Sequence, residues 1–297
     1  MRQSVSGNLP KQQLYFAGID IGSTMTKVVL IGEDDSLRSV IKGPTGPEHR
    51  RLANEVMREA LDKAGLSIDN ISYIVATGYG RLNVPFADRQ ITELSCHARG
   101  VFSLFPDVRT AIDIGGQDAK CMKIAGGKLL DFVMNDRCAA GTGRFLEVTA
   151  AALGIKLEDM GDMSGRATRK IKISSMCTIF AQQEVVALLS QGEKPENILA
   201  GLHDALASRV AGLARRLGIQ PDVVLTGGVA KNTGMVRAMR ESLGLELLVP
   251  EEPLITGALG AAILAAEAYN KAASAGEILP PKSRRLEQAT FFGQEQG

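Results

Sequence analysis

The sequence predicts an α/β protein built from two lobes, and three observations support this prediction. The chain has 297 residues, which is enough for two domains of ordinary size with a sizeable buried core. Its residues are 45% hydrophobic, with 32 glycines, no tryptophan and 4% aromatics, a composition that favours aliphatic packing and many tight turns. One short pattern of strand, Asp-Ile-Gly, polar turn and second strand also occurs twice along the chain.

The two copies of this pattern each read as a β-hairpin. In the first, the apolar run 14–20 leads through Asp-Ile-Gly and a polar turn into a second strand at 28–31. In the second, TAIDIGGQD at 110–118 leads into AKCMKIAGGKLLDFV. A third element, VVLTGGVAKNTG at 223–234, is predicted as a strand that runs into a Gly-Gly turn and a helix. The chain therefore contains two related halves.

The remaining pattern divides the chain into parts. We expect lobe I at 14–107, lobe II at 108–257, and a C-terminal helix at 258–280 that packs back toward lobe I. The polar ends, 1–13 and 281–297, are expected to be flexible tails. Helices are predicted at His49–Ala64, around Thr92–Phe102, at about Phe145–Leu153, and at Thr178–Gln191, Pro195–Leu217 and Met235–Leu243, with strands at Tyr73–Thr77 and Asp222–Leu225.

Composition and motifs exclude several classes of protein. A net charge of +1 with scattered basic residues gives no field that favours nucleic acid or an anionic membrane as a partner. The first residues lack the apolar core of a signal peptide, and no stretch approaches the ~20 apolar residues of a membrane span, so we expect a soluble cytoplasmic protein. The absence of GxxxxGK[ST] excludes a P-loop, and no GxGxxG opens a helix after the first strand.

The two Asp-x-Gly turns have the chemistry of a phosphate site. Asp20 and Asp113 each place a carboxylate at the end of a strand, where glycine lets the backbone approach a ligand closely. Serine, threonine and lysine just beyond supply donors for phosphate. Two such turns that face each other across a cleft can hold a triphosphate and its Mg²⁺, and Gly227 and Gly228 leave room for base and sugar.

Three segments in this order resemble the nucleotide-binding superfamily of actin, the seventy-kilodalton heat-shock chaperones and the sugar kinases. They are GIDIGSTMTK, DIGGQDAK and LTGGVAKN. The resemblance implies two ribonuclease-H-like lobes, an actin-like ATPase fold, with ATP·Mg in the interlobe cleft. Asp20 and Asp113 would hold Mg²⁺ through water and help to position the attacking water, with Gln117 as a further catalytic candidate. The implied nucleotide contacts are Gly22, Ser23, Thr24, Thr26, Lys27, Gly115, Gly116, Gly227, Gly228 and Asn232.

Two of the four cysteines precede predicted helices. Cys138 stands before AAGTGRFLEVTAAALG, and Cys177 before TIFAQQEVVALLSQG. A position near the positive end of a helix lowers the pKa of a thiol and favours an anionic ligand such as an iron–sulfur cluster. The alternative is that each cysteine is a small buried hydrophobe. Two sulfurs cannot complete a cluster that needs four thiolates, but a two-fold dimer of this chain could.

A closer resemblance covers nearly the whole chain, from about Phe16 to Ala266. NDRCAAGTGRFLE, SSMCTIFAQQEV and DIGGQDAK together resemble the activator components of 2-hydroxyacyl-CoA dehydratases, in the BadF/BadG/BcrA/BcrD-type group that includes benzoyl-CoA reductase ATPase subunits. The resemblance implies a homodimeric, oxygen-sensitive ATPase in which Cys138 and Cys177 hold one bridging 4Fe-4S cluster. It further implies ferredoxin or flavodoxin as the electron donor, and a 2-hydroxyacyl-CoA dehydratase or related double-cluster reductase as the acceptor.

Two other functions are alternatives to this one. A small-molecule kinase, particularly an amino-sugar kinase, would need a hydroxyl-activating aspartate and polar sugar-binding residues, and no segment provides that pattern. The second turn also carries Gln117 and Asp118 in place of the hydroxyl-rich loop usual in kinases. A nucleotide-dependent scaffold or chaperone-like switch is the non-enzymatic alternative, but the chain has no substrate-binding extension.

The other cysteines and histidines are expected to be structural. Cys96 and His97 are adjacent in a predicted helix and point about 100° apart, which makes them a poor two-ligand metal site and favours packing roles. Cys121 is expected in the core. His49 and His203 are expected to be solvated or capping, and Glu184 to lie on a helix surface or near an interface.

Overall fold

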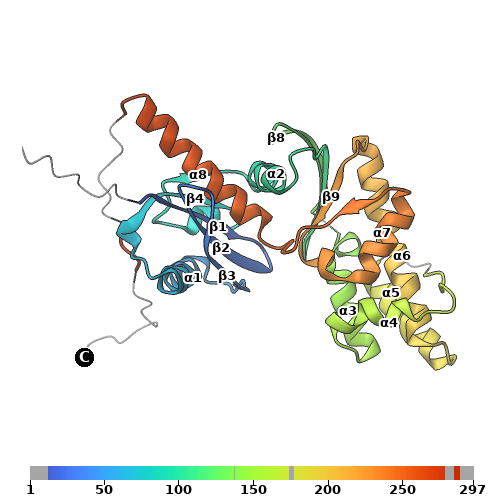
Figure 1. The fold of residues 1–297 in the computed structure, drawn as a ribbon. Helices are drawn as coiled ribbons and strands as arrows, with labels where there is room; N and C mark the ends of the chain where they lie inside the picture. Colours follow the sequence, from blue (N-terminus) through green and yellow to red (C-terminus); the bar gives the residue numbers. More distant parts are fainter. Residues whose placement is uncertain (1–12, 137, 174–176, 278–283, 288–297) are drawn as a thin grey trace, which may run out of the picture.

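The computed structural model describes residues 13–136, 138–173, 177–277 and 284–287. Two lobes lie side by side, with lobe I in blue and cyan and lobe II in green to orange (Figure 1). Each lobe is built on one five-stranded mixed sheet that is covered by helices on both faces. The fold class predicted from the sequence is therefore confirmed.

Lobe I contains the first sheet, in the strand order β3-β2-β1-β4-β5. The first three strands form an antiparallel meander, and β4 and β5 then pair in parallel beside β1. Helix α1 (His49–Ala64) covers one face and matches its predicted bounds. The strands are β1 (Tyr15–Ile21), β2 (Met25–Gly32), β3 (Leu37–Pro44), β4 (Ile71–Thr77) and β5 (Arg89–Gln90), with short 3-10 turns at Ile68–Asn70 and Arg81–Asn83.

Lobe II repeats this topology with the order β10-β9-β6-β7-β8. Again three antiparallel strands are followed by two parallel ones. The repeated sequence pattern thus corresponds to a repeated supersecondary unit. The strands are β6 (Thr110–Ile114), β7 (Ala119–Ala125), β8 (Lys128–Asn135), β9 (Val223–Thr226) and β10 (Leu247–Leu248).

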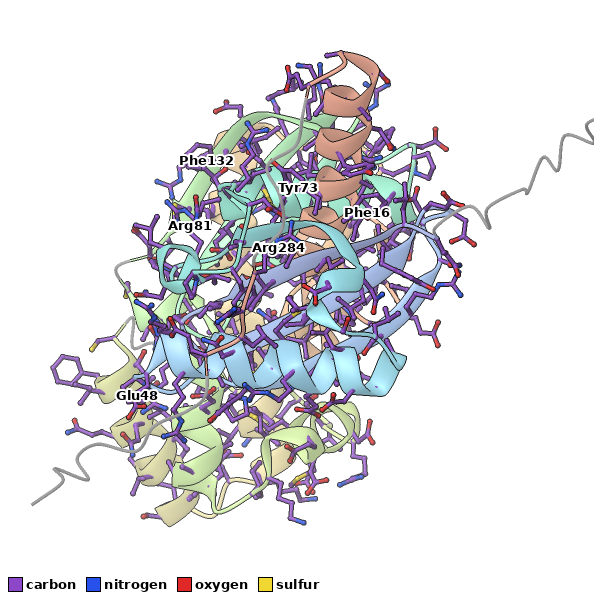
Figure 2. All side chains as sticks on the ribbon, turned by 90° about the vertical axis from the view of Figure 1, so that its left-hand side faces the viewer. Phe16, Glu48, Tyr73, Arg81, Phe132 and Arg284 are labelled. Atoms are coloured by element: carbon purple, nitrogen blue, oxygen red, sulfur yellow. The ribbon has the colours of Figure 1, made fainter. Side chains whose placement is uncertain are left out.

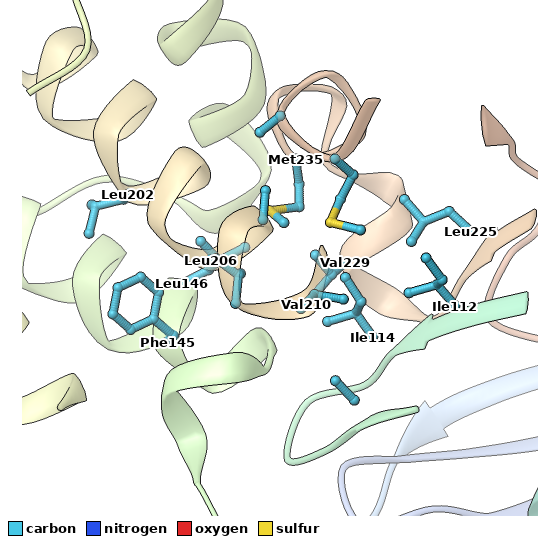
Figure 3. Packing of buried hydrophobic residues seen from close by; sticks show 14 of the residues in the cluster. Ile112, Ile114, Phe145, Leu146, Leu202, Leu206, Val210, Leu225, Val229 and Met235 are labelled. Carbon is cyan, nitrogen blue, oxygen red and sulfur yellow. The ribbon is translucent and has the colours of Figure 1, made fainter. Parts of the chain in front are cut away.

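The largest hydrophobic core lies between the second sheet and the helices of lobe II. Phe145 and Leu146 pack from one side, and Leu206 and Val210 from the long helix beside them (Figure 3). The helices are α3 (Gly143–Leu153), α4 (Met160–Gly165), α5 (Thr178–Ser190), α6 (Pro195–Leu217) and α7 (Thr233–Leu243), with 3-10 turns η3 (Ala139–Gly141), η4 (Leu157–Asp159) and η5 (Gly228–Lys231).

Helices α2 (Glu93–Leu104) and α8 (Thr256–Ser274) connect the lobes. α8 packs on the first sheet, whereas α2 packs between α8 and the second sheet. The two helices cross at Gly100 and Gly260. A Cβ on Gly260 would lie 1.8 Å from the carbonyl oxygen of Cys96, so only glycine permits this approach. This crossing fixes how α2 meets the first lobe.

Several features differ from the sequence-based expectations. β5 and β10 are two-residue strands that no local pattern indicated, and α8 begins two residues earlier than expected. Residues 284–287, expected within a flexible tail, are held on lobe I (Figure 2): Arg284 Nη1 donates to the carbonyl of Ile71 at 2.6 Å and its guanidinium pairs with Asp88. Residues 1–12, 278–283 and 288–297 lie outside the described residues.

Within the described part of the chain, no helix is both long and apolar enough to cross a membrane.

Candidate functional site

The two predicted aspartates point toward the same pair of helices because of the two-residue period of a strand. In β1, Ile19 and Ile21 face the core under α1, so Asp20 faces α8. In β6, Ile112 and Ile114 face the main core of lobe II, so Asp113 faces α2. Both carboxylates are thereby directed at the α2–α8 layer between the lobes.

Asp20 is paired with Lys27 at the base of the first turn. The two residues stand opposite each other in the β1–β2 ladder, and Lys27 Nζ donates to Asp20 Oδ2 at 3.0 Å. Burial lowers the pKa of Lys27, but the attraction of Asp20 and, more weakly, of Asp113 and Glu93 outweighs burial, so the pKa is raised. Asp20 is 1% exposed, and its Oδ1 has no hydrogen-bond partner among the described residues.

Asp113 is paired with Lys120 in the same way. These residues also stand opposite each other, in the β6–β7 ladder, with Lys120 Nζ 3.6 Å from Asp113 Oδ2. Thr226 Oγ1 donates to Asp113 Oδ1 at 2.9 Å. Burial raises the pKa of Asp113, but His97 and Lys120 outweigh it and the pKa is lowered. Asp113 is therefore an ionised carboxylate despite its burial. In both lobes the lysine follows the aspartate by seven residues, a signal that sequence reasoning missed.

Helix α2 adds Glu93 and His97 to this group. Lys120 Nζ lies 2.8 Å from Glu93 Oε1 and 2.7 Å from Asp118 Oδ1, and burial raises the pKa of Glu93. His97 Nδ1 lies 3.8 Å from Asp113 Oδ1 and 3.1 Å from Thr256 Oγ1. His97 therefore lines the cleft in addition to packing. Cys96, the neighbouring residue, is buried against α8 as expected.

Glu93, His97 and Asp113 could in principle share a metal ion, because one ligand atom of each lies within 4.8 Å of the others. The ammonium of Lys120, however, lies beside both carboxylates of this group. A cation of the protein is therefore already present between these carboxylates, and we assign no metal ion shared by the three side chains.

The two Asp-Ile-Gly turns face each other. Each is closed by a backbone hydrogen bond: the Gly22 amide donates to the Met25 carbonyl at 3.1 Å, and the Gly115 amide to the Asp118 carbonyl at 2.9 Å. Thr24 of the first turn lies directly on Gly116 of the second, where an added Cβ would come within 2.4 Å of Thr24 Oγ1. A side chain at position 116 would force the turns apart.

A cavity of about 490 Å³ lies between these turns and η5. This volume falls in the range of small-ligand sites. Of the predicted residues, Thr26 bonds Thr45 through its hydroxyl, Gln117 is exposed on the second turn, and Asp20 lies behind Lys27. The predicted residues that line the cavity are Gly22, Ser23, Thr24, Lys27, Asp113, Gly115, Gly116, Gly227, Gly228 and Asn232.

The third segment approaches the second turn through Gly227. Its φ of 86° is in the region that favours glycine, and a Cβ there would lie 2.4 Å from the Ile114 carbonyl oxygen. Asn232 Oδ1 accepts from the Met235 amide at 2.9 Å and caps α7, while its Nδ2 has no partner among the described residues. A buried amide donor is thus available at the wall of the cavity.

The four cysteines fall into two classes. Cys138 and Cys177 are exposed, and each is the residue that immediately precedes a helix, η3 and α5 respectively. Cys96 and Cys121 are buried, and burial raises the pKa of each to about 12. The expectation that Cys121 is a core residue is confirmed.

The Cys138 segment is tied to the second turn by hydrogen bonds. The amides of Gly143 and Arg144 donate to the carbonyls of Gly115 and Gly116, both at 2.8 Å. Thr142 Oγ1 also donates to the Gly116 carbonyl at 3.1 Å. The second turn is therefore joined directly to the start of α3, a few residues after Cys138.

His203 differs from its expected surface role. It is 1% exposed on α6, and neither ring nitrogen has a hydrogen-bond partner among the described residues. Burial, helped by Arg237, lowers its pKa to about 4, so the ring is neutral at physiological pH.

Comparison with known proteins gives consistent matches. The model of the BadF/BadG/BcrA/BcrD ATPase family matches residues 17–265. The 2-hydroxyisocaproyl-CoA dehydratase activator of Clostridioides difficile is 48% identical over 258 residues, which is 85% of this chain and 95% of that protein. Among solved structures, component A of the (R)-2-hydroxyglutaryl-CoA dehydratase of Acidaminococcus fermentans has a TM-score of 0.84 at 42% identity. The match covers 86% of this chain and 99% of that chain.

A second solved structure is the activator of the 2-hydroxyisocaproyl-CoA dehydratase from Clostridium difficile with bound ADPNP. Its TM-score is 0.83 at 43% identity, and the match covers 90% of this chain and 100% of that chain. Together these likenesses show that the two repeated lobes form the actin-like ATPase fold, as the resemblance of the three segments implied.

Proposed function

The chain belongs to the BadF/BadG/BcrA/BcrD ATPase family, and from this premise we propose that it hydrolyses ATP to drive single electrons onto a partner enzyme. The electron would come from ferredoxin or flavodoxin and pass through one 4Fe-4S cluster shared by two copies of the chain. The acceptor would be a 2-hydroxyacyl-CoA dehydratase or a related double-cluster reductase. The observation that carries this proposal is the hydrogen-bonded link between the second turn and the segment that bears Cys138.

The residues of the cleft suit a nucleoside triphosphate with Mg²⁺. Asp20 and Asp113 would hold the ion through water, and the unpartnered Oδ1 of Asp20 is available for such a contact. Lys27 would neutralise phosphate, and the amides and hydroxyls of the two turns would donate to phosphate oxygens. Gly227 and Gly228 would leave room for the nucleoside. Gln117, exposed on the second turn, would meet the attacking water when the lobes close on ATP.

The residues around the two exposed cysteines fit an iron–sulfur cluster. Both thiols are exposed. Cys177 immediately precedes α5, whose first amides favour an anion. Cys138 immediately precedes the three-residue turn η3, and the amides that open α3 are used by the second turn. Beside Cys177, the side chains of Ile179 and Phe180 are 65% and 62% exposed, an apolar surface suited to a second subunit. When bound, the cluster supplies a one-electron carrier. The protein would supply two thiolates from each copy, and the amino end of α5 beside Cys177.

Anaerobic iron and sulfide analysis tests the electron-transfer part of the proposal. The reconstituted protein is expected to bind about four iron atoms per dimer. Cys138→Ala and Cys177→Ala should abolish iron binding and leave ATP binding intact, whereas Cys96→Ala should keep the iron. A protein that binds no iron after reconstitution would eliminate this function.

The kinase alternative predicts a different product. In our proposal water attacks the γ-phosphorus of ATP, and ADP and inorganic phosphate leave. Release of inorganic phosphate without any added acceptor, and no phosphorylated sugar when amino sugars are supplied, is the expected result. Stoichiometric transfer of the γ-phosphoryl group to a sugar would instead establish the kinase.

A further inference from the structure

Arg209 on α6 faces the turn that bears Cys138. Its Nη1 donates to the carbonyl of Ala140 at 2.6 Å, and its guanidinium carbon lies 5.6 Å from the centroid of the Phe145 ring. One side chain thus contacts both η3 and the first turn of α3. Arg209 and Cys138 also line the same cavity of about 510 Å³.

The backbone around Arg209 is held in place by the core. Leu206 and Val210, on the same helix, are 0% and 2% exposed and belong to the main hydrophobic cluster of lobe II. Rotation of α6 would expose these side chains to water, at a cost of about 2 kcal/mol for each. The backbone of Arg209 is therefore held in place while its side chain reaches the turn.

Both cysteines lie within electrostatic reach of this guanidinium. Burial is the main influence on Arg209 and lowers its pKa, while the Cys138 and Cys177 sulfurs act in the opposite direction. An arginine remains protonated under all such conditions. A permanent positive charge therefore lines the same cavity as Cys138 and acts electrostatically on both sulfurs that the proposed function assigns to the cluster.

We propose that Arg209 is a positioning residue that fixes the Cys138 turn and that its charge raises the reduction potential of the cluster. This inference rests on the proposed function. One electron from the ferredoxin- or flavodoxin-class donor makes the cluster more negative by one charge, so a nearby cation stabilises the reduced state more than the oxidised state. Loss of the cation should shift the midpoint potential to a more negative value.

The test compares Arg209→Gln and Arg209→Lys by redox titration monitored by electron paramagnetic resonance. Arg209→Gln removes the charge, so its midpoint potential should be more negative than that of the wild type. Arg209→Lys keeps the charge, so its potential should stay at the wild-type value. In the protein without iron, hydrogen exchange of residues 138–145 should be faster in Arg209→Gln, because the bond to Ala140 is lost.

Arg215→Gln is the matched control. It removes the same charge from the same helix, but its guanidinium donates to the carbonyl of Ser242, away from the cysteines. Its potential and the exchange of residues 138–145 should equal those of the wild type. A shift as large as that of Arg209→Gln would show a general charge effect and overturn the inference.

The outcomes separate this inference from the proposed function. If the wild type binds no iron, both are overturned. If the wild type carries a cluster and Arg209→Gln leaves its potential unchanged, only the role of Arg209 is overturned. Should Arg209→Gln fail to fold, Arg209→Met, which also removes the charge, takes its place: a more negative potential supports the inference, and an unchanged potential overturns it.

Discussion

Lys27 and Lys120 occupy the same place in the two lobes, each opposite an aspartate across a hairpin. Their surroundings differ. Lys27 has one carboxylate partner, whereas the ammonium of Lys120 contacts Glu93 and Asp118 and lies near Asp113. Lys120 is therefore the charge that allows two buried carboxylates, Asp113 and Asp118, and the partly buried Glu93 to lie together between α2 and lobe II.

Replacement of this lysine should be costly to stability. Lys120→Met would leave the carboxylates without their cation, and we expect the free energy of unfolding at neutral pH to fall by about 3–5 kcal/mol. Lys123→Met, on the same strand but outside the cleft, should cost less than about 1 kcal/mol. Urea denaturation of both variants gives the comparison, and equal losses would contradict this role for Lys120.

The pH dependence of the Lys120→Met defect follows from the raised pKa of Glu93. A carboxyl whose pKa is higher in the folded than in the unfolded state destabilises the protein at high pH, and the penalty disappears as the pH falls through the folded pKa and the group takes a proton. Without Lys120 this pKa should rise further. The stability difference between wild type and Lys120→Met should therefore shrink on acidification, as urea denaturation at pH 7 and pH 5 would show.

The thiols provide a second test at the residue scale. In the protein without iron, Cys138 and Cys177 are exposed and should react with iodoacetamide under native conditions. Cys96 and Cys121 are buried, with a pKa of about 12, so both are protonated and inaccessible until the chain unfolds. Mass spectrometry should find two labels in native buffer and four in denaturant. Rapid labelling of Cys96 would contradict the observed packing of α2 on α8.

Sequence reasoning identified the residues whose chemistry is local. Asp20 and Asp113 stand in a repeated Asp-Ile-Gly pattern, and the strand period alone decides which way they point. Glu93 and His97 were missed because they come from a helix whose approach to the cleft is set by tertiary packing. The seven-residue spacing from aspartate to lysine would have identified Lys120, had the two halves been aligned residue by residue.

Among the elements, those with a strong amphipathic pattern were predicted best. α1 and α6 match their expected bounds because buried residues recur at helical spacing. Each helix also ends at a glycine in the left-handed backbone conformation, Gly65 and Gly218. β5 and β10 pair along only two residues, and such pairing is decided by neighbouring strands. α8 is apolar on several sides, so its pattern marks the first turn poorly.

The crossing of α2 and α8 gives a prediction at the scale of elements. Gly260→Ala would place a Cβ 1.8 Å from the Cys96 carbonyl oxygen, so the helices must separate. We expect a loss of about 1–3 kcal/mol, although alanine is the better helix former. Gly212→Ala, on α6, meets no atom within 4 Å and should stabilise by about 1 kcal/mol. Thermal denaturation of both variants should give shifts of opposite sign.

At the scale of the whole molecule, the cleft is lined by residues of both lobes and by Glu93 and His97 of α2. If ATP·Mg draws the two lobes closer together, the radius of gyration measured by small-angle X-ray scattering should fall when a non-hydrolysable analogue and Mg²⁺ are added. Asp113→Asn weakens the proposed ion site and should reduce this change. An unchanged radius in the wild type, with the analogue shown to be bound, would contradict closure.

The two-lobed arrangement was predictable because the repeated pattern specifies two copies of one unit. The manner in which the lobes meet was not predictable. It depends on Gly100 and Gly260, where α2 and α8 cross. In the sequence alone, a glycine within a helical pattern only lowers the helix propensity of its segment, and nothing indicates that a second helix packs against it.

The link between the second turn and α3 also determines how the protein tolerates mutation. Two of its three hydrogen bonds join main-chain amides to main-chain carbonyls, and only the Thr142 hydroxyl contributes a side chain. Replacement of Arg144 by any residue other than proline would keep the hydrogen bond from the amide of residue 144 to the Gly116 carbonyl. Side chains along this path can therefore change during evolution while the main-chain hydrogen bonds between the second turn and α3 are kept.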